Sequence, residues 1–178
     1  MTEITLTFTS GRRLDVEIAE NFAASTLEEV QEQAMECLEG NQEGPYNPDG
    51  QSDEDDMPTP EQIWDAYVLE VSSDDISGVN KDNLSDWLPY LLWVSNSDHK
   101  NKVAIAEAAE ELDIDADNID DCYQGEFANE AAFAEHLATN MSELPAIPDW
   151  IRIDWAGTWE YSLRYDYSHE NGHFFRDI

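Results

Sequence analysis

The chain has 178 residues, and its 41% apolar and 11% aromatic content is enough to build hydrophobic cores, which excludes a disordered acidic tail. Its charge is extreme, because 41 aspartates and glutamates face 8 lysines and arginines, for a formal net charge of −33. Nucleic acids and anionic membranes would repel such a chain, so we expect its partner to be a basic protein.

Compartment follows from what the sequence lacks. It has no apolar run of about 18 residues and no signal-peptide pattern, which predicts a cytoplasmic protein with no membrane contact. Cys37 and Cys122 lie in unrelated contexts, and we expect two free thiols, although the sequence leaves a bridge between them open.

The first 75 residues predict a small α+β lobe. Alternating apolar residues indicate a hairpin over residues 3–19, with its turn at Ser10–Gly11. A capping-box pattern at residues 25–29 then starts a helix that runs to about Glu39, with Gly40 as its stop signal.

An acidic, mobile loop is expected over residues 41–58, which carry several glycines and prolines and the run Asp53–Asp56. Thr59, followed by Pro60 at the first helical position, predicts the start of a further helix. Apolar residues alternate after it, so this helix gives way to a strand that closes the first lobe.

Residues 76–122 predict a helical middle lobe. Leu84 opens a helical apolar spacing, and Pro89 indicates that this helix starts late or kinks. A second helix is expected over residues 100–112, with its glutamates outward and four residues inward: Val103, Ala104, Ala108 and Leu112.

Residues 123–178 predict a C-terminal α+β lobe. Asn129 caps a short helix that places Phe133 and Leu137 on one face. A Pro-marked break at residues 144–148 follows, and Asn171–Gly172 predicts a hairpin turn into a final strand. We therefore expect an elongated α+β chain of two to three lobes: an N-terminal hairpin-plus-helix lobe, a helical middle and a C-terminal α+β lobe.

Charge placement is more informative than total charge. From Leu14 to Asn80 there are 19 carboxylates and no lysine or arginine, and from Val103 to Ile151 there are 13 more and again none. Ordinary acidic surfaces intersperse lysines, so these two stretches indicate a continuous negative face. The plain alternative is a solvated acidic surface without a partner.

Two patterns resemble metal sites but lack what a metal site needs. Residues 169–173 match H-E-x-x-H, but Asn171–Gly172 in its centre favours a hairpin turn over the helix that a zinc site needs. Asp113, Asp115 and Asp117 have EF-hand spacing, but Asn118 and Gln124 stand where the loop needs Gly and Glu. With no nucleophile or phosphate-binding motif either, we expect no enzyme, no catalytic residue, no metal and no cofactor.

The stretch from Tyr123 to Arg176 carries a set of features in a fixed order. They are Tyr123-x-Gly125-x-Phe127, an acidic Phe/Ala helix, Ile153-Asp154-Trp155, Asp166-Tyr167, and Gly172 followed by Phe175-Arg176. This order resembles the C-terminal part of the ArdA antirestriction family, and residues 84–121 resemble it more faintly. The family usually has an arginine near the position of Glu160. The resemblance implies an acidic DNA mimic that occupies the DNA groove of a type I restriction–modification enzyme, and a homodimer.

Charge density supports this hypothesis. B-DNA carries one charge per about 1.7 Å of axis, so 33 charges correspond to about 56 Å, or roughly 16 base pairs. Glu107, Glu110 and Glu111 lie three to four residues apart, so they share one helix face. We expect the partner-binding carboxylates to be these: Glu107, Glu110, Glu111, Asp113, Asp115, Asp117, Asp120, Asp121, Glu126, Glu130 and Glu135.

Two other functions fit the same composition. High-salt adaptation also replaces lysine by aspartate and glutamate, and an obligate halophile should unfold in dilute buffer. The chain could also be an acidic binder of another basic protein. Trp150, Trp155 and Trp159 provide more apolar bulk than a small lobe needs, which fits a dimer interface, whereas their plain alternative is a lobe core.

Overall fold

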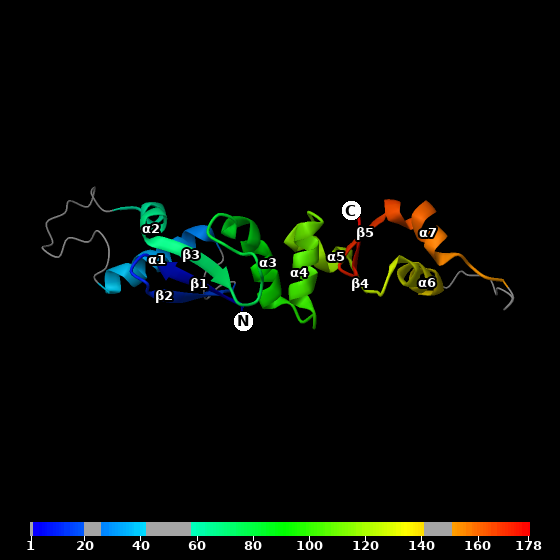
Figure 1. The fold of residues 1–178 in the computed structure, drawn as a ribbon, viewed down its shortest axis with the longest axis horizontal. Coiled ribbons are helices and arrows are strands. Elements are labelled where there is room, and N and C mark those ends of the chain that lie inside the picture. The colour runs from blue at the N-terminus through cyan, green and yellow to red at the C-terminus, as the bar shows by residue number, and fades with distance from the viewer. Residues whose placement is uncertain (1, 20–25, 42–57, 141–150) are drawn as a thin grey trace, which may run out of the picture. The chain divides into compact units, whose positions relative to one another are not determined.

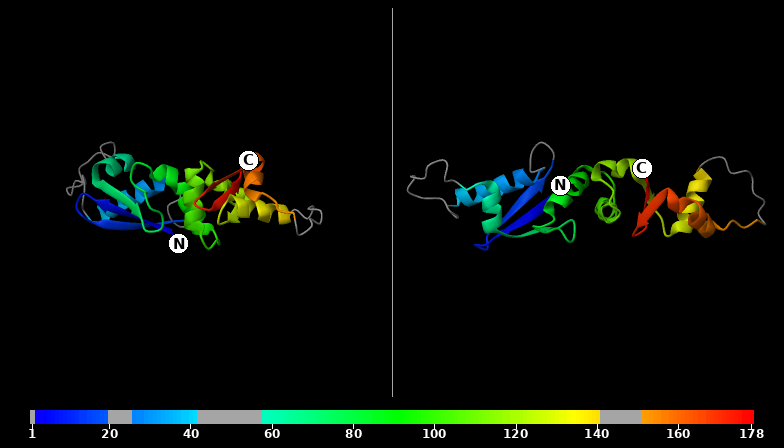
Figure 2. Two further views of the ribbon diagram at one scale, coloured as in Figure 1. Left: turned by 45° about the vertical axis from the view of Figure 1, so that its right-hand side comes forward. Right: turned by 90° about the horizontal axis from the view of Figure 1, so that it is seen from above.

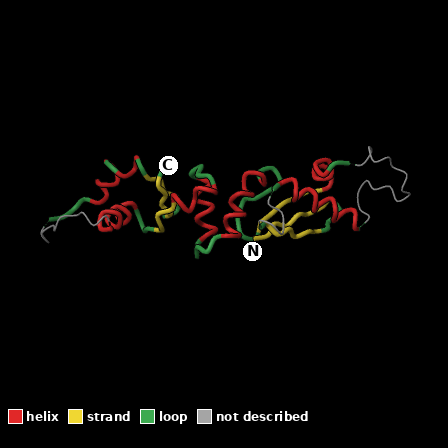
Figure 3. Tube along the Cα trace, turned by 180° about the vertical axis from the view of Figure 1, so that it is seen from behind, coloured by secondary structure: helices red, strands yellow, loops and turns green. Residues whose placement is uncertain are grey.

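The computed structural model describes residues 2–19, 26–41, 58–140 and 151–178. The chain forms two compact units, residues 1–103 and 104–178, each with helices and its own three-stranded antiparallel sheet (Figure 1; Figure 3, strands in yellow). The expected α+β class is therefore confirmed. The boundary near residue 103 differs from the boundaries expected after residues 75 and 122. The elongated arrangement of lobes stays a prediction.

The N-terminal unit contains a sheet of order β2-β1-β3 and three helices. Along the chain these are β1 (Thr2–Phe8), β2 (Arg13–Ile18), α1 (Leu27–Gly40), α2 (Pro60–Tyr67), β3 (Val68–Ser73) and α3 (Leu84–Asn96). The predicted hairpin is β1–β2, and the predicted closing strand is β3, which pairs with β1. The acidic loop expected over residues 41–58 lies almost wholly outside the described residues.

One face of this sheet forms the core of the N-terminal unit. Ile4, Leu6 and Phe8 are buried on β1, and Val16 and Ile18 are buried on β2 beside them. The side chains between them are polar and point to the other face, as the period of a strand requires. Helices α1 and α3 contact the strands, and α2 packs on α1 (Figure 2, right panel).

Both helix starts predicted from capping patterns are confirmed. In α1 the Glu29 N–H donates to Thr26 Oγ1 at 3.3 Å, and the Thr26 N–H donates to Glu29 Oε2 at 3.0 Å. Thr59 and Gln62 make the same reciprocal pair at the start of α2. Each box satisfies two backbone donors that a helix start leaves unpaired.

Helix α3 starts at Leu84, so of the two effects expected of Pro89 the late start is wrong, and the kink stays a prediction. Pro89 is its sixth residue and has no N–H to donate to the carbonyl of Ser85. Burial of Leu84, Trp87 and Leu91 outweighs this loss, because a fully buried large apolar side chain contributes roughly 1.5–3 kcal/mol.

Lys81 secures the end of α2. Its Nζ donates to the carbonyl oxygens of Trp64 at 2.8 Å, Val68 at 3.0 Å and Asp65 at 3.4 Å. These carbonyls belong to the last turn of α2 and to the strand after it, where the helix dipole favours a cation. The ammonium also lies 5.8 Å from the Trp64 ring centroid.

The C-terminal unit contains a sheet of order β4-β6-β5. The elements from the unit boundary onward are α4 (Lys102–Glu111), η2 (Ala116–Asn118), α5 (Ile119–Cys122), β4 (Tyr123–Glu126), α6 (Glu130–Asn140), α7 (Trp155–Tyr161), η3 (Leu163–Tyr165), β5 (Tyr167–Glu170) and β6 (His173–Arg176). Asn129 Oδ1 accepts from the Ala132 N–H at 3.0 Å, which confirms the predicted cap of α6. Residues 144–148, where a break was expected, lie outside the described residues.

The buried face of α4 differs from the prediction. Ile105, Ala106 and Ala109 are buried together with Ala108, whereas Val103, Ala104 and Leu112 are half-buried. Only Ala108 was assigned correctly. The physical reason is that alanines occupy several faces of this helix, so apolar spacing does not distinguish one face from another.

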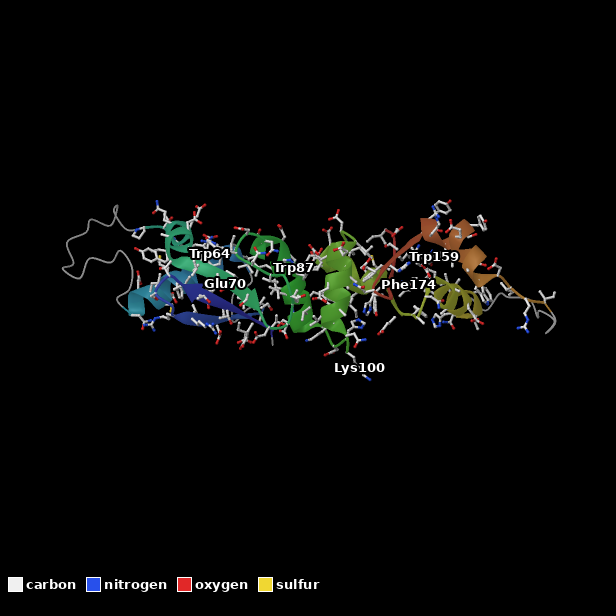
Figure 4. All side chains as sticks on the ribbon, in the orientation of Figure 1. Trp64, Glu70, Trp87, Lys100, Trp159 and Phe174 are labelled. Atoms are coloured by element: carbon white, nitrogen blue, oxygen red, sulfur yellow. The ribbon has the colours of Figure 1, made fainter. Side chains whose placement is uncertain are left out.

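Stacked aromatic rings fill the core of the C-terminal unit. Phe133 on α6 stacks on Phe174 of β6 with ring centroids 4.5 Å apart, and Trp159 on α7 meets Phe174 edge-on at 5.6 Å (Figure 4). The ring centroid of Tyr167 on β5 lies 5.1 Å from that of Phe133. These contacts join α6 and α7 to the sheet. Trp159 is half-buried, so it contacts the lobe core and still exposes part of its ring, and the dimer interface stays a prediction.

A polar pair, of which His173 is buried and Tyr123 is half-buried, lies beside this core. The hydroxyl of Tyr123 on β4 and Nδ1 of His173 on β6 are 3.0 Å apart. Burial lowers the pKa of His173, although Glu126 acts in the opposite direction. Burial, followed by the charge of Glu126, raises the pKa of Tyr123. Both side chains are therefore neutral in the folded unit at neutral pH.

We predict that Lys81→Met destabilises the protein by about 2 kcal/mol, because charge-assisted hydrogen bonds to partly buried carbonyls are lost. Urea unfolding of the full chain measures the change. Lys100→Met is the matched control, since it removes the same charge from an exposed position. Equal losses in the two variants would contradict the structural role of Lys81.

We also predict that His173 makes stability depend on pH. An unfolded histidine gains its proton near pH 6.5, whereas folded His173 resists protonation until lower pH. Its contribution is therefore complete above pH 6.5 and is lost as the pH falls through the lowered folded pKa. The difference in unfolding free energy between wild type and His173→Gln should shrink between pH 7.5 and about pH 5.5. A constant difference would show that protonation of His173 is not linked to folding.

Candidate functional site

All eleven candidate carboxylates lie in the C-terminal unit, between α4 and α6. Three of them, Glu107, Glu110 and Glu130, are half-buried. The other eight are exposed: Glu111, Asp113, Asp115, Asp117, Asp120, Asp121, Glu126 and Glu135. Seven of these eight fall within residues 111–126, which we call the acidic segment.

Within the acidic segment, buried apolar residues and exposed carboxylates occupy different positions of the chain. Ala116, Ile119 and Cys122 are buried, and every carboxylate between residues 111 and 126 is exposed. The backbone is in regular elements from residue 116 to residue 126, since η2, α5 and β4 follow one another directly. The buried side chains thus anchor the segment and hold its carboxylates outward at fixed positions.

Asp113 occupies an unusual backbone position at the start of the segment. Its φ is +58°, in the left-handed region that favours glycine. The Asp113 N–H donates to the Glu110 carbonyl at 3.0 Å, and the Ile114 N–H donates to the Ala109 carbonyl at 2.9 Å. These two bonds form a Schellman motif that ends α4. A carboxylate therefore stands where glycine would be less strained.

Cations are scarce around this segment. The C-terminal unit has 18 aspartates and glutamates and three arginines, Arg152, Arg164 and Arg176. Arg164 pairs with Glu160. Among the candidates, Glu130 lies 3.3 Å from Nε2 of His169. In the described part of the chain no lysine or arginine forms an ion pair with Glu111, Asp115 or Asp117.

A hollow of about 270 Å³ lies beside the acidic segment. Its lining includes Asp113 and Asp115 from the acidic segment. It also includes Arg176, the last residue of β6, and Asp177 after it. Cys122 also lines it, and burial, followed by the charges of Asp121 and Asp177, raises the pKa of its thiol. The thiol is therefore protonated at neutral pH and a weak nucleophile. Cys37 and Cys122 are both free, as expected.

The H-E-x-x-H pattern is a hairpin, as predicted. Asn171 and Gly172 have φ of +50° and +86°, which is the turn between β5 and β6. Glu170 pairs with His173 and His169 with Phe174, so the two histidines lie on opposite faces of the sheet. His169 stacks on Phe174 at 4.6 Å, whereas His173 bonds Tyr123. These two imidazoles do not converge on one metal ion.

The three aspartates with EF-hand-like spacing lie at the end of one helix and the start of the next, and not in a calcium-binding loop. Asp113 ends α4, while Asp115 and Asp117 flank the start of η2. No group of three or more histidine, cysteine or acidic side chains arranged to hold a metal ion occurs among the described residues. The exposed carboxylates of the acidic segment give this surface a dense negative charge.

Sequence reasoning missed the exposed aromatic rings. Tyr161 and Tyr165 are 82% and 69% exposed, in α7 and η3 of the C-terminal unit. The sequence instead indicated three tryptophans. Trp155 and Trp159 are both half-buried, with Trp159 in contact with Phe174, and Trp150 lies outside the described residues. A run of aromatic residues carries no period that separates the exposed rings from the buried ones.

We predict that Asp113→Gly is more stable than Asp113→Asn by roughly 0.5–1 kcal/mol, because glycine relieves the left-handed backbone while both changes remove the same charge. Thermal or urea unfolding of the two variants measures this difference. If the asparagine variant were equally stable, the backbone at residue 113 would not be strained.

None of the described helices is long and apolar enough to cross a membrane. In comparisons with known proteins, no family model, curated protein or solved structure matches this chain.

Proposed function

We propose that the protein is an acidic DNA mimic that acts in the cytoplasm. It binds the DNA-binding groove of a type I restriction–modification enzyme, or of a related basic defence enzyme, and blocks access of DNA. The observation that carries this proposal is the acidic segment, where seven exposed carboxylates lie within residues 111–126 with no lysine or arginine among them. The resemblance of residues 123–176 to the ArdA family supports the same target class.

The mechanism needs no chemistry. A groove that binds DNA presents lysines and arginines at phosphate positions, and the outward carboxylates would pair with them in place of phosphates. Binding gains from release of the counterions that both surfaces hold, so affinity should fall as salt rises. Because buried residues such as Ile119 anchor the acidic segment, little backbone freedom is lost on binding.

A salt-adapted protein would expose carboxylates in the same way, so exposure does not separate the two functions. Stability in dilute buffer does separate them, because a DNA mimic must be folded at the salt concentrations at which restriction enzymes act. We expect near-native circular dichroism in dilute buffer, whereas unfolding without molar salt would favour salt adaptation.

We also expect a homodimer, from the family resemblance, which light scattering would detect as twice the mass of one chain.

The central prediction concerns charge removal from the acidic segment and α6. Six exposed carboxylates are changed to their amides together: Glu111, Asp113, Asp115, Asp117, Asp121 and Glu135. If each contributes about 0.5 kcal/mol, inhibition of DNA binding by the target enzyme should weaken roughly a hundredfold. Fluorescence anisotropy of a labelled duplex bound to the enzyme measures this loss, and each single change should have little effect.

The matched control removes the same charge from exposed positions of the N-terminal unit: Glu3, Glu17, Glu61, Asp65, Glu70 and Asp82. This variant should inhibit far better than the first. Both variants should be as stable as wild type or more stable, since self-repulsion falls. Equal losses of inhibition would mean that net charge alone acts and that the acidic segment is not the binding surface.

A further inference from the structure

Two tyrosine rings of the C-terminal unit are exposed, where the other aromatic residues are mostly packed. Tyr161 ends α7 and Tyr165 ends η3, four residues later. They are the exposed aromatic rings among the large apolar side chains that the structure describes. The core cluster around Phe133 and Phe174 is complete without them. Folding therefore gives no reason for these rings to be aromatic.

A guanidinium already lies against this surface. The central carbon of the Arg164 guanidinium is 5.3 Å from the Tyr165 ring centroid, and Arg164 Nη1 donates to Glu160 Oε1 at 2.5 Å. A ring face and a carboxylate thus hold one planar cation between them. This geometry suits arginine, whose guanidinium can stack on a ring and donate to a carboxylate at once.

We propose that Glu160 and Tyr165, together with the exposed ring of Tyr161 next to Glu160 in the chain, form a docking site for arginine side chains of a basic protein partner, and that Arg164 occupies the Glu160 and Tyr165 part of this site in the free protein. The inference rests on the proposed function, since it assigns part of the partner surface. Charge complementarity selects the occupant, because the unit that carries the site has 18 carboxylates against three arginines. A second copy of the chain would bring the same excess of negative charge to the site.

The site adds a selectivity that the acidic segment lacks. Carboxylates attract lysine and arginine alike, whereas an aromatic face favours the flat and weakly hydrated guanidinium. Contacts to a ring release no counterion, so they should contribute affinity without changing the dependence on salt. Arginine would displace Arg164 from Tyr165 and use the free face of Tyr161.

The test compares binding of an oligo-arginine and an oligo-lysine peptide of equal length to the full chain. Wild type should bind oligo-arginine more tightly. Changing Tyr161 and Tyr165 to alanine should weaken oligo-arginine binding on the order of tenfold, at two- to fivefold per ring, and leave oligo-lysine binding unchanged. Changing both to phenylalanine should keep the preference, because the rings remain. Loss of oligo-arginine binding in both double variants, or in neither, would overturn the proposal.

Arg164→Ala provides an independent arm, with Arg152→Ala as its matched control. Both variants remove one exposed arginine from the same unit, so they change its charge equally. Only Arg164→Ala vacates the docking site, so it should raise oligo-arginine affinity several-fold more than Arg152→Ala does. Equal affinities would overturn the proposal. Because neither arm uses a DNA-binding enzyme, failure here is separate from failure to compete with DNA.

Discussion

Self-repulsion among carboxylates is the constraint on which the rest of this structure depends. A net charge of −33 opposes every compact arrangement of the chain, so apolar burial must outweigh it in units of modest size. The N-terminal unit does this with the alternating buried side chains of β1 and β2, whose strands α1 and α3 contact, and the C-terminal unit does it with stacked rings around Phe133 and Phe174. The few cations are used locally, as where Lys81 secures the end of α2.

The acidic segment shows how this constraint and the proposed function meet. Its buried residues are small or aliphatic and anchor the backbone, and all its exposed positions are carboxylates. Asp113 retains a charge at a backbone position that glycine would occupy with less strain. In our proposal this fixed charge supplies attraction to a basic groove, while the exposed tyrosines of α7 and η3 add discrimination between arginine and lysine.

Features with a local physical cause could be predicted from the sequence. The hairpin β1–β2, the capping boxes at Thr26 and Thr59, and the Asn171–Gly172 turn each depend on residues close in the chain. Features set by tertiary packing could not. The alanines of α4 conceal its buried face, and α3 joins the N-terminal unit through contacts with β1 and β2, which lie far earlier in the chain.

In the candidate site too, features with a local cause could be predicted and features set by tertiary packing could not. Exposure of eight carboxylates follows from the cost of burying charge, which the sequence reveals directly. The partial burial of Glu130 depends on the packing of α6, and its partner His169 comes from a distant strand, which helical spacing does not indicate. The guanidinium against Tyr165 escaped prediction because ring exposure has no sequence period.

The central claim is that this protein and DNA occupy the same surface of the target enzyme. An equilibrium titration tests it most directly: labelled duplex is bound to a type I restriction–modification enzyme at several fixed concentrations of this protein. The account predicts that the apparent Kd for DNA rises in proportion to the protein concentration, while binding at saturating DNA stays complete. A Kd that reaches a plateau, with a ternary complex of enzyme, DNA and this protein, would contradict it.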